Sequence, residues 1–259
     1  MTKIIAIANQ KGGVGKTTSS VNLAASLSVM KRKVLIIDMD PQGNATTGIG
    51  LDKHNPPVAL SDVLLGDAQV EDAIQNVPNT NVEALAGGPD LTVAEFQMMQ
   101  MDEREYHLRN VLQSIKERYD YIIIDCPPSL NMLTVNALVA ADGVLIPMQC
   151  EYYALEGLSA LISSIKTIRE NSNPNLEVIG LLRTMYDPRN NLARDVAKQL
   201  AHHFGDKLYN TSIPRNIRLA EAPSHGMPVL LYDKRSTGAL AHLALAAELI
   251  RKEAARQAA

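Results

Sequence analysis

The stretch that decides the fold is Lys11-Gly12-Gly13-Val14-Gly15-Lys16-Thr17-Thr18, which follows the apolar run Ile4–Ala8. Glycines let a backbone curl until successive N–H groups converge on phosphate oxygens, and a helix that begins directly after the loop adds partial positive charge. Lys16 is placed to reach the β- and γ-phosphates of a nucleotide, and the Thr17 hydroxyl to ligate Mg²⁺. The pattern therefore predicts a phosphate-binding loop between a buried strand and a helix.

The loop departs from the common pattern at one position, because Gln10 stands where that pattern has glycine. Lys11 and the pair Gly12-Gly13 take its place. The alternative reading is a glycine-rich turn that binds nothing, but it would crowd two lysines onto one strand–helix corner without a reason. We therefore expect a bound phosphate.

Apolar runs rich in β-branched residues alternate with helical patterns along the chain, which is typical of βαβ units and a parallel sheet. The expected strands are Ile4–Ala8, Val34–Asp38, Tyr121–Asp125, Val144–Pro147 and Val178–Leu182. No linker, repeat or low-complexity tract interrupts the pattern. The predicted fold is a single α/β domain over residues 1–259, a doubly wound and mostly parallel sheet flanked by helices.

Three helices are expected from apolar residues that recur at helical spacing. The first follows the glycine loop and faces inward through Val21, Ala24, Ala25 and Leu27. The second does so through Leu155, Leu158, Ile162, Ile165 and Ile168. The third runs from about Thr237 towards Arg256 with Leu240, Leu243 and Ile250 inward. The stretch from Asp52 to Asp102 is expected to form loops and short helices over the sheet edge. Its methionines Met98, Met99 and Met101 are expected as core filler, and the alternative is a binding face near a partner surface.

Composition excludes several classes of protein. The net charge is −3 and aromatic residues make up 4% of 259 residues, so neither a bulk polycation nor a stacking platform for single-stranded nucleic acid is expected. Cys126 and Cys150 lack the spacing of a zinc or redox site and are expected to be buried thiols. Neither a signal segment nor a membrane span is apparent, which predicts a cytoplasmic protein.

Two acidic motifs end other expected strands, Ile37-Asp38-Met39-Asp40-Pro41-Gln42-Gly43-Asn44 and Ile124-Asp125-Cys126-Pro127-Pro128-Ser129. Together with the glycine loop they resemble the ParA/MinD group of P-loop ATPases with a deviant Walker A motif. The resemblance runs nearly end to end and is closest to the short partition ATPases called ParA or Soj. It implies ATP and Mg²⁺ as cofactors.

The resemblance also implies residue roles. Lys11 matches the signature lysine that crosses a dimer interface to the partner's nucleotide, so that dimerisation responds to ATP over ADP. Asp40 matches the aspartate that positions the attacking water, while Asp38 supports the Mg²⁺ shell and Asp125 matches the Walker B carboxylate. Lys11, Lys16 and Asp40 are thus the expected catalytic residues. The bland alternative for Asp38 and Asp125 is a strand-end carboxylate that caps a helix or turn.

The loop Ile213-Pro214-Arg215-Asn216 resembles the family segment that packs on the adenine base. Pro214 would offer a rigid apolar face, and Asn216 a paired donor and acceptor for the base edge. Met185 is expected to line the other side, with Asp187 close by. A Pro-Arg-Asn turn is also common in loops that bind nothing.

Basic charge is concentrated between Arg183 and Arg235, where nine basic residues stand against five acidic ones, so this segment is net +4 and the remainder −7. Such asymmetry is what binding to phosphate backbones without sequence readout would require. Arg189 and Arg218 align with arginines that the partition family uses for nonspecific DNA contact. The candidate DNA-binding residues are Arg189, Arg215, Arg218, Lys234 and Arg235, and the alternative for each is a solvated charged face.

The resemblance implies three partners: a second copy of the chain in an ATP-dependent homodimer, nonspecific double-stranded DNA in the nucleoid, and a ParB/Spo0J-like centromere-binding protein that stimulates slow hydrolysis. A cargo made of protein rather than DNA stays open. A MinD-like ATPase that cycles on a membrane is the nearest alternative, but the alanines after Ile250 offer lipid little area. An iron–sulfur carrier would need paired cysteines.

Overall fold

The computed structural model describes residues 2–152 and 154–258, which contain one eight-stranded sheet in the order β3-β4-β2-β5-β1-β6-β7-β8. The β3–β4 pair is antiparallel, and every other neighbouring pair is parallel. The strands are β1 (Lys3–Ile7), β2 (Val34–Asp38), β3 (Ile74–Asn76), β4 (Val82–Leu85), β5 (Tyr121–Asp125), β6 (Gly143–Met148), β7 (Glu177–Arg183) and β8 (Leu208–Ser212). The α/β fold class with a mostly parallel sheet is confirmed.

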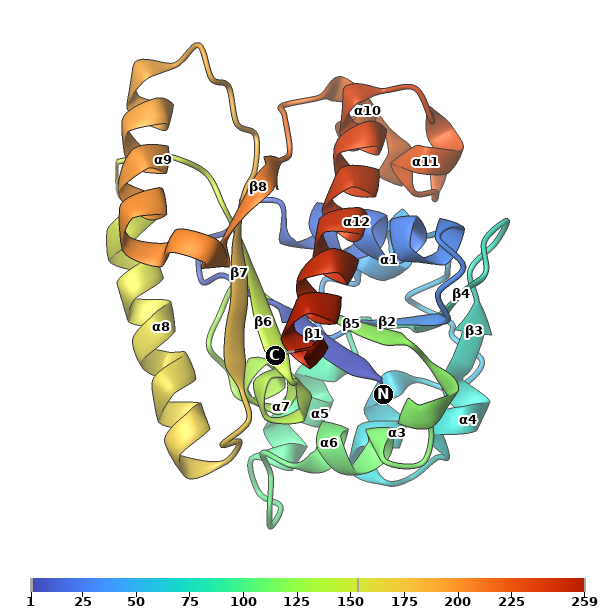
Figure 1. Cartoon of the computed structure of the whole chain (residues 1–259). Helices are drawn as coiled ribbons and strands as arrows, with labels where there is room; N and C mark the ends of the chain where they lie inside the picture. The colour runs from blue at the N-terminus through green and yellow to red at the C-terminus, as the bar shows by residue number, and fades with distance from the viewer. Residues whose placement is uncertain (1, 153, 259) are drawn as a thin grey trace.

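Helices cover both faces of the sheet, and two separate apolar cores fill the layers between (Figure 1). One face carries α1 (Lys16–Val29), α2 (Asn44–Gly48), α10 (Ile217–Glu221), η3 (Ala222–His225), α11 (Val229–Tyr232) and α12 (Thr237–Ala258). The other carries α3 (Leu60–Leu65), α4 (Val70–Ala73), α5 (Leu91–Met98), α6 (His107–Leu112), α7 (Met132–Ala140), α8 (Ala154–Asn171) and α9 (Asn191–Phe204). Two short 3₁₀ turns, η1 (Lys116–Arg118) and η2 (Gly205–Lys207), lead into β5 and β8.

The five expected strands form within one residue of their predicted ends, because each is an apolar run that the sheet buries on both faces. The inward faces predicted for α1 and α8 are also confirmed: every residue named for α1 is buried, and those named for α8 are buried or partly buried in the core. Cys126 and Cys150 are buried free thiols, as expected.

The stretch between residues 52 and 102 holds more order than expected. Besides short helices it contributes β3 and β4, which extend the sheet beyond β2. The interpretation of its methionines as core filler holds only for Met98, which is fully buried, whereas Met99 and Met101 are exposed. These two follow the C-terminal end of α5, beyond the reach of the core.

The inward face predicted for the last helix is only partly right, because Ile250 packs against the core but Leu240 does not. Leu240 is 54% exposed, and Leu243 and Ile250 are only partly buried. The buried face of α12 is instead formed by Ala239, His242, Leu245, Ala246 and Leu249. Ala239 and Ala246 let α12 pack closely on α1 and β8, and Leu245 and Leu249 are buried beside them. Among the described residues no helix combines the length and apolarity that crossing a bilayer requires.

A buried carboxylate joins α12 to the outer strand β8. Glu248 accepts hydrogen bonds from the backbone N–H groups of Asn210 and Thr211, both at 2.8 Å. Burial alone would raise the pKa of Glu248, but the hydrogen bonds from Thr211 and Asn210 outweigh it, and the pKa lies below its ordinary value. An edge strand exposes unpaired N–H groups, and here one side chain satisfies two of them.

We expect Glu248→Gln to lower the free energy of unfolding by about 1–3 kcal/mol, because one buried N–H would face an amide donor. Urea denaturation at neutral pH measures the loss, with the exposed Glu177→Gln as the control. Because the folded pKa is lowered, the stabilisation is present above the unfolded pKa and is lost as the pH falls through the folded value. A deficit that persists unchanged well below pH 4 would contradict this assignment.

Candidate nucleotide site

The candidate site lies at the carboxyl ends of three neighbouring strands, β1, β5 and β2. The glycine loop follows β1, Asp125 ends β5 and Asp38 ends β2. Parallel pairing places Asp125 opposite both Ile7 and Asp38 in register. Ligands of open α/β sheets bind outside this edge, so three motifs far apart in sequence meet where such a ligand would sit.

The glycine loop has the backbone that phosphate binding requires. Gly13 and Gly15 have φ of 71° and 85°, a left-handed conformation that other residues adopt at a cost. Within the described part of the chain, no acceptor takes up the N–H groups of Gly12, Gly13 or Gly15. Unpaired N–H groups that converge in one loop are an anion-binding arrangement.

Lys16 begins α1 and is 7% exposed. Its ammonium group donates a hydrogen bond to the carbonyl oxygen of Lys11 at 3.2 Å, so the Lys16 side chain folds back over the glycine loop. Burial lowers the pKa of Lys16, and the nearby carboxylate of Asp125 partly opposes this effect. A buried ammonium with a single neutral acceptor is poised to pair with an anion.

Asp125 is fully buried and accepts hydrogen bonds from two hydroxyls of α1, Thr17 at 2.8 Å and Ser20 at 2.7 Å. Burial raises the pKa of Asp125, and the charge of Asp38 raises it further, although both hydroxyls act in the opposite direction. The direct Thr17–Asp125 contact brings together a hydroxyl and a carboxylate, the oxygen ligands that Mg²⁺ accepts in nucleotide sites.

Asp38 holds the segment that carries Asp40. Its Oδ2 accepts from the backbone N–H and the hydroxyl of Thr46, both at 2.8 Å, and its Oδ1 accepts from the N–H of Asp40 at 3.1 Å. Burial raises the pKa of Asp38, against the hydrogen bonds from Thr46. Asp40 in turn accepts from the N–H of Gln42 at 3.0 Å.

Asp40 therefore faces the same cavity as the glycine loop. This cavity measures about 580 Å³, a volume within the usual range for nucleotide-sized ligands. The glycines of the loop, the buried ammonium group of Lys16, the Thr17 hydroxyl and the Asp40 carboxylate line it together. This donor set fits a magnesium nucleotide.

A smaller hollow of about 180 Å³ adjoins the loop on the side expected for the base. Met185 and Pro214, two of the residues expected near the base, both line it. Met185 has a φ of 48°, unusual for a residue with a side chain, and its sulfur accepts from the Gln149 amide at 3.0 Å. The same amide donates to the carbonyl of Gly13 at 3.0 Å, which ties this hollow to the phosphate loop.

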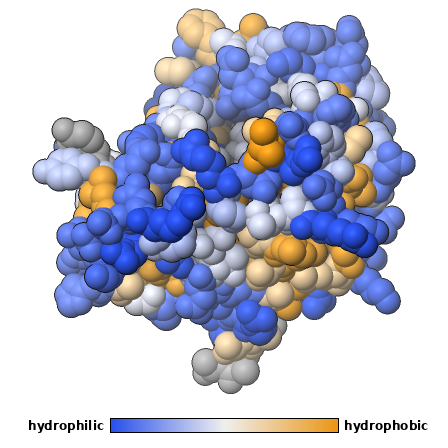
Figure 2. Space-filling view, turned by 90° about the horizontal axis from the view of Figure 1, so that it is seen from above, coloured by the Kyte–Doolittle hydropathy of each residue, from blue (hydrophilic) through white to orange (hydrophobic). Residues whose placement is uncertain are grey.

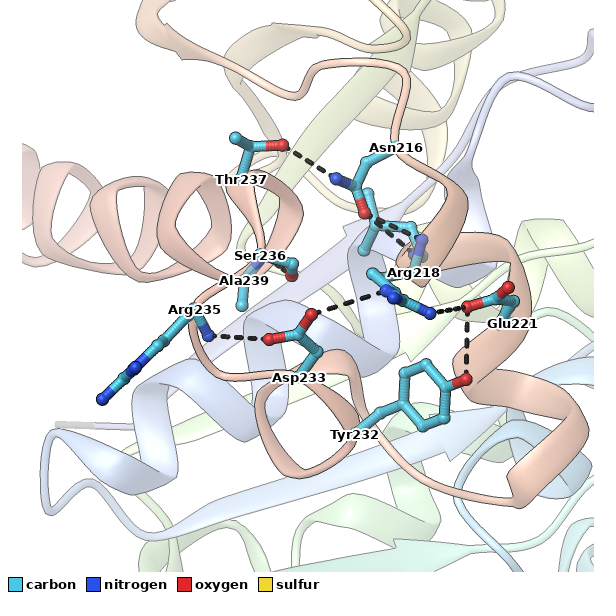
Figure 3. A network of polar contacts seen from close by, with 10 residues as sticks. Asn216, Arg218, Glu221, Tyr232, Asp233, Arg235, Ser236, Thr237 and Ala239 are labelled. Atoms are coloured by element: carbon cyan, nitrogen blue, oxygen red, sulfur yellow. Dashed lines mark hydrogen bonds and ion pairs between the residues drawn. The ribbon is translucent and has the colours of Figure 1, made fainter.

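Asn216 also lines the hollow, but its side chain already has partners. Its Oδ1 caps α10 by accepting from the N–H groups of Arg218 and Leu219, and its Nδ2 donates to the Thr237 hydroxyl at 2.8 Å (Figure 3). Only the second N–H of the amide is left for a base. The paired donor and acceptor predicted from sequence are thus largely used within the fold.

Three residues of this site were not expected from sequence, namely Ser20, Thr46 and Gln149. Ser20 lies one turn after Lys16, and a buried serine on that face of the helix was the available signal. Thr46 falls eight residues after Asp38, and its N–H and hydroxyl meet the Asp38 carboxylate only because α2 folds back. Gln149 follows β6 on another part of the sheet, so only the topology reveals it.

The five candidate DNA-binding residues divide into two sets. Arg189 forms hydrogen bonds and an ion pair with Asp187, and Arg218 pairs with Glu221 at 2.7 Å and with Asp233 at 3.5 Å. The pKa of Arg218 is raised by its bond to Glu221. In the described part of the chain, the side chains of Arg215, Lys234 and Arg235 are exposed and have no carboxylate partner.

Comparison with known proteins shows which family the chain resembles along nearly its whole length. A family model described as an AAA domain matches residues 2–178. The sporulation initiation inhibitor protein Soj of Bacillus subtilis is 50% identical over 249 residues, which cover 96% of this chain and 98% of that protein. The chromosome partitioning protein ParA of Caulobacter vibrioides is 49% identical over 258 residues, with 99% and 97% covered.

A solved structure shares the fold closely. It is described as cobyrinic acid a,c-diamide synthase from Mycobacterium smegmatis with bound ADP and magnesium, and it matches with a TM-score of 0.85 and 36% identity. The match covers 97% of this chain and 95% of that chain. ATP and Mg²⁺ as cofactors are consistent with what this homologous structure binds.

We expect binding of MgADP near pH 7 to release protons, because a Mg²⁺ site needs ionised carboxylates and the pKa values of Asp38 and Asp125 are raised in the free protein. The affinity for MgADP should therefore weaken as the pH falls from about 8 to 6. Calorimetry in buffers of different ionisation enthalpy measures the number of protons released when MgADP binds. The Asp125→Asn variant should release fewer protons than the native protein. Binding heats that do not depend on the buffer would contradict the predicted coupling between MgADP binding and proton release.

Proposed function

We propose that this chain, which belongs to the ParA/Soj family of chromosome-partitioning proteins, is a partition ATPase whose ATP-bound dimer holds DNA and whose ADP-bound form releases it. The observation that carries the proposal is the meeting of the glycine loop, Asp40 and Asp125 at one sheet edge. The Mycobacterium smegmatis structure bears the name of a synthase, but its identity of 36% is lower than the 50% shared with Soj.

The residues of the site divide the work of phosphoryl transfer. Thr17 and Asp125 are the residues that we assign to hold Mg²⁺, with Asp38 in support, and the bound ion supplies neutralisation of the phosphate charge. Lys16 and the loop N–H groups orient the phosphates. Asp40, fixed by its own backbone bonds, positions the attacking water. Such a transfer requires mainly positioning and charge stabilisation, which this set provides.

The position of the Lys11 side chain supports a role for this residue across a dimer interface, because its ammonium group does not bind to its own glycine loop. Its ammonium group lies 2.5 Å from Glu151 of the same chain, and both side chains are about half exposed, 50% and 51%. A surface ion pair of this kind is worth about 0.2–1 kcal/mol. Lys11 can therefore leave Glu151 for the triphosphate of a second copy at little cost.

The basic face supports binding to DNA without sequence readout. Arg215, Lys234 and Arg235 flank α10 and the start of α12, and the Arg235 side chain points away from the polar network around Arg218 (Figure 3). Seen from above, this end of the molecule is mostly hydrophilic, with separate apolar patches (Figure 2). A dimer would offer two such faces, and each added phosphate contact steepens the affinity through counterion release.

The remaining partners follow from the same family. We infer a ParB/Spo0J-like protein that stimulates hydrolysis, and a location on the nucleoid. α12 buries Leu245, Ala246 and Leu249 inside the fold, so these residues are not available to a membrane surface. A membrane-cycling role therefore has no support from this helix.

The dimer is tested with two single variants. Sedimentation of the native protein should show a dimer with ATP and a monomer with ADP, and Lys11→Ala should stay monomeric in both, because no second ammonium reaches the triphosphate. Asp40→Ala should still dimerise but hydrolyse ATP more slowly by about 100-fold or more. Full hydrolysis by Asp40→Ala would reject the assigned water-positioning role.

Binding to unrelated DNA duplexes tests the basic face. Each of Arg215→Ala, Lys234→Ala and Arg235→Ala should weaken binding similarly for all sequences and reduce the slope of log affinity against log salt by about 1. Lys166→Ala, on the opposite side of the sheet in α8, is the matched control. Equal affinity of the native protein for DNA with ATP and with ADP would overturn the switch.

A further inference from the structure

The short helix α2 is fixed to the candidate site at its N-terminal end. Asp38 accepts two hydrogen bonds from Thr46 in its first turns, and the carbonyl of Asp40 accepts from the N–H of Gly43 at 2.8 Å. α2 spans five residues and rises only about 7 Å, so it has no room to bend. Whatever moves Asp38 and Asp40 therefore moves the whole helix.

The turn that ends α2 meets a second turn, backbone against backbone. Gly50 and Gly226 have φ of 85° and 61°. A Cβ atom added to Gly50 would lie 2.6 Å from the carbonyl oxygen of Gly226, and one added to Gly226 would lie 2.9 Å from Cα of Gly50. No side chain separates the two turns. Close-packed backbones transmit displacement with little give.

Gly226 ends η3, which continues directly from α10 and thus from Arg218. The Arg218 guanidinium lies between Glu221 on α10 and Asp233 just after α11, an arrangement that we call the Arg218 cage (Figure 3). Tyr232 donates to Glu221 at 3.2 Å. Along the sequence, one carboxylate of the cage, Glu221, thus precedes the Gly226 turn and the other, Asp233, follows it.

The far side of the cage is anchored to a different element. The N–H of Val229, at the start of α11, donates to the side chain of Asn22 on α1 at 2.8 Å. α11 is therefore held by the helix of the phosphate loop, whereas η3 rests on α2 through Gly226. A shift of α2 against α1 would change the distance between Glu221 and Asp233.

We infer that the Gly50–Gly226 contact couples the nucleotide site to the basic face. A ligand that displaces Asp38 and Asp40 moves α2, α2 pushes the Gly226 turn, and the Arg218 cage opens so that Arg218 can pair with a phosphate of DNA. This inference rests on the proposed binding of DNA. It adds the route by which the nucleotide state reaches that face.

The test compares two glycines with the same backbone conformation. Gly50 and Gly66 both have φ of 85°, but a Cβ on Gly66 meets nothing within 4 Å. Gly50→Ala and Gly66→Ala therefore share the backbone strain, and only Gly50→Ala disturbs the contact. In the native protein we expect DNA affinity with ATP to exceed that with ADP by a factor in the range of about 5–150.

In Gly50→Ala this ratio should fall to within about twofold of one, while Gly66→Ala keeps it and both variants still bind MgADP. Asp233→Asn should raise DNA affinity in the ADP state by about 3-fold or more, because one wall of the Arg218 cage loses its charge. A Gly50→Ala protein that keeps the native ratio would overturn the coupling.

Hydrogen exchange of the native protein decides the question if Gly50→Ala does not fold. Without any DNA, a non-hydrolysable ATP analogue should change the protection of amides in residues 217–233 relative to ADP, and peptides of α8 should stay unchanged. Identical protection of residues 217–233 in the two states would overturn the inference. Failure of the native protein to bind DNA in any state would instead reject the proposed function, and the exchange experiment would still report on the coupling.

Discussion

The structure depends on one electrostatic constraint, the burial of three carboxylates (Asp38, Asp40 and Asp125) and the Lys16 ammonium at a single edge of the sheet. Asp38, Asp125 and Lys16 are each less than 10% exposed, and burial opposes the charged form of all three. Buried charges are costly unless they are paired. The neighbouring hydroxyls and N–H groups offset part of this cost, and a magnesium nucleotide would offset the rest by bringing opposite charges to both sides.

This constraint explains why the parallel sheet is a suitable scaffold. Parallel pairing sets β1, β5 and β2 side by side with their carboxyl ends level, and each strand delivers one part of the site. The two apolar cores, one on each face of the sheet, hold these strand ends in place. The helix after the glycine loop then serves twice, through Thr17 and Ser20 towards Asp125 and through Asn22 towards α11.

The sequence predicts the parts of this arrangement that are local. Each buried strand is recognisable as an apolar run, and the glycine loop and both acidic motifs are each one continuous stretch of sequence. β3 and β4 escape prediction because they are only three and four residues long and carry polar residues among the apolar ones. The pattern does not reveal which face of α12 is buried, because leucines and alanines occur on several sides of this helix and the buried face combines Ala239 and Ala246 with Leu245 and Leu249.

Long-range polar pairing is the other limit. Arg218 and Asp233 are fifteen positions apart in sequence and form an ion pair only because η3 and α11 fold back. A count of charges along the sequence therefore treats both side chains as unpaired. Asn216 likewise has the donor and acceptor that a base requires, but its Oδ1 already caps α10 and its Nδ2 already donates to the Thr237 hydroxyl.

The pairing of these arginines also bears on how a switch can work. Arg189 and Arg218 are held at the surface by carboxylates that water screens, so their ion pairs are weak and open readily. Had the same pairs been buried, breaking one would leave an uncompensated buried charge, at a cost of about 3–5 kcal/mol. A DNA-binding face regulated in the proposed way would have to keep its paired arginines exposed, and Arg189 and Arg218 are exposed.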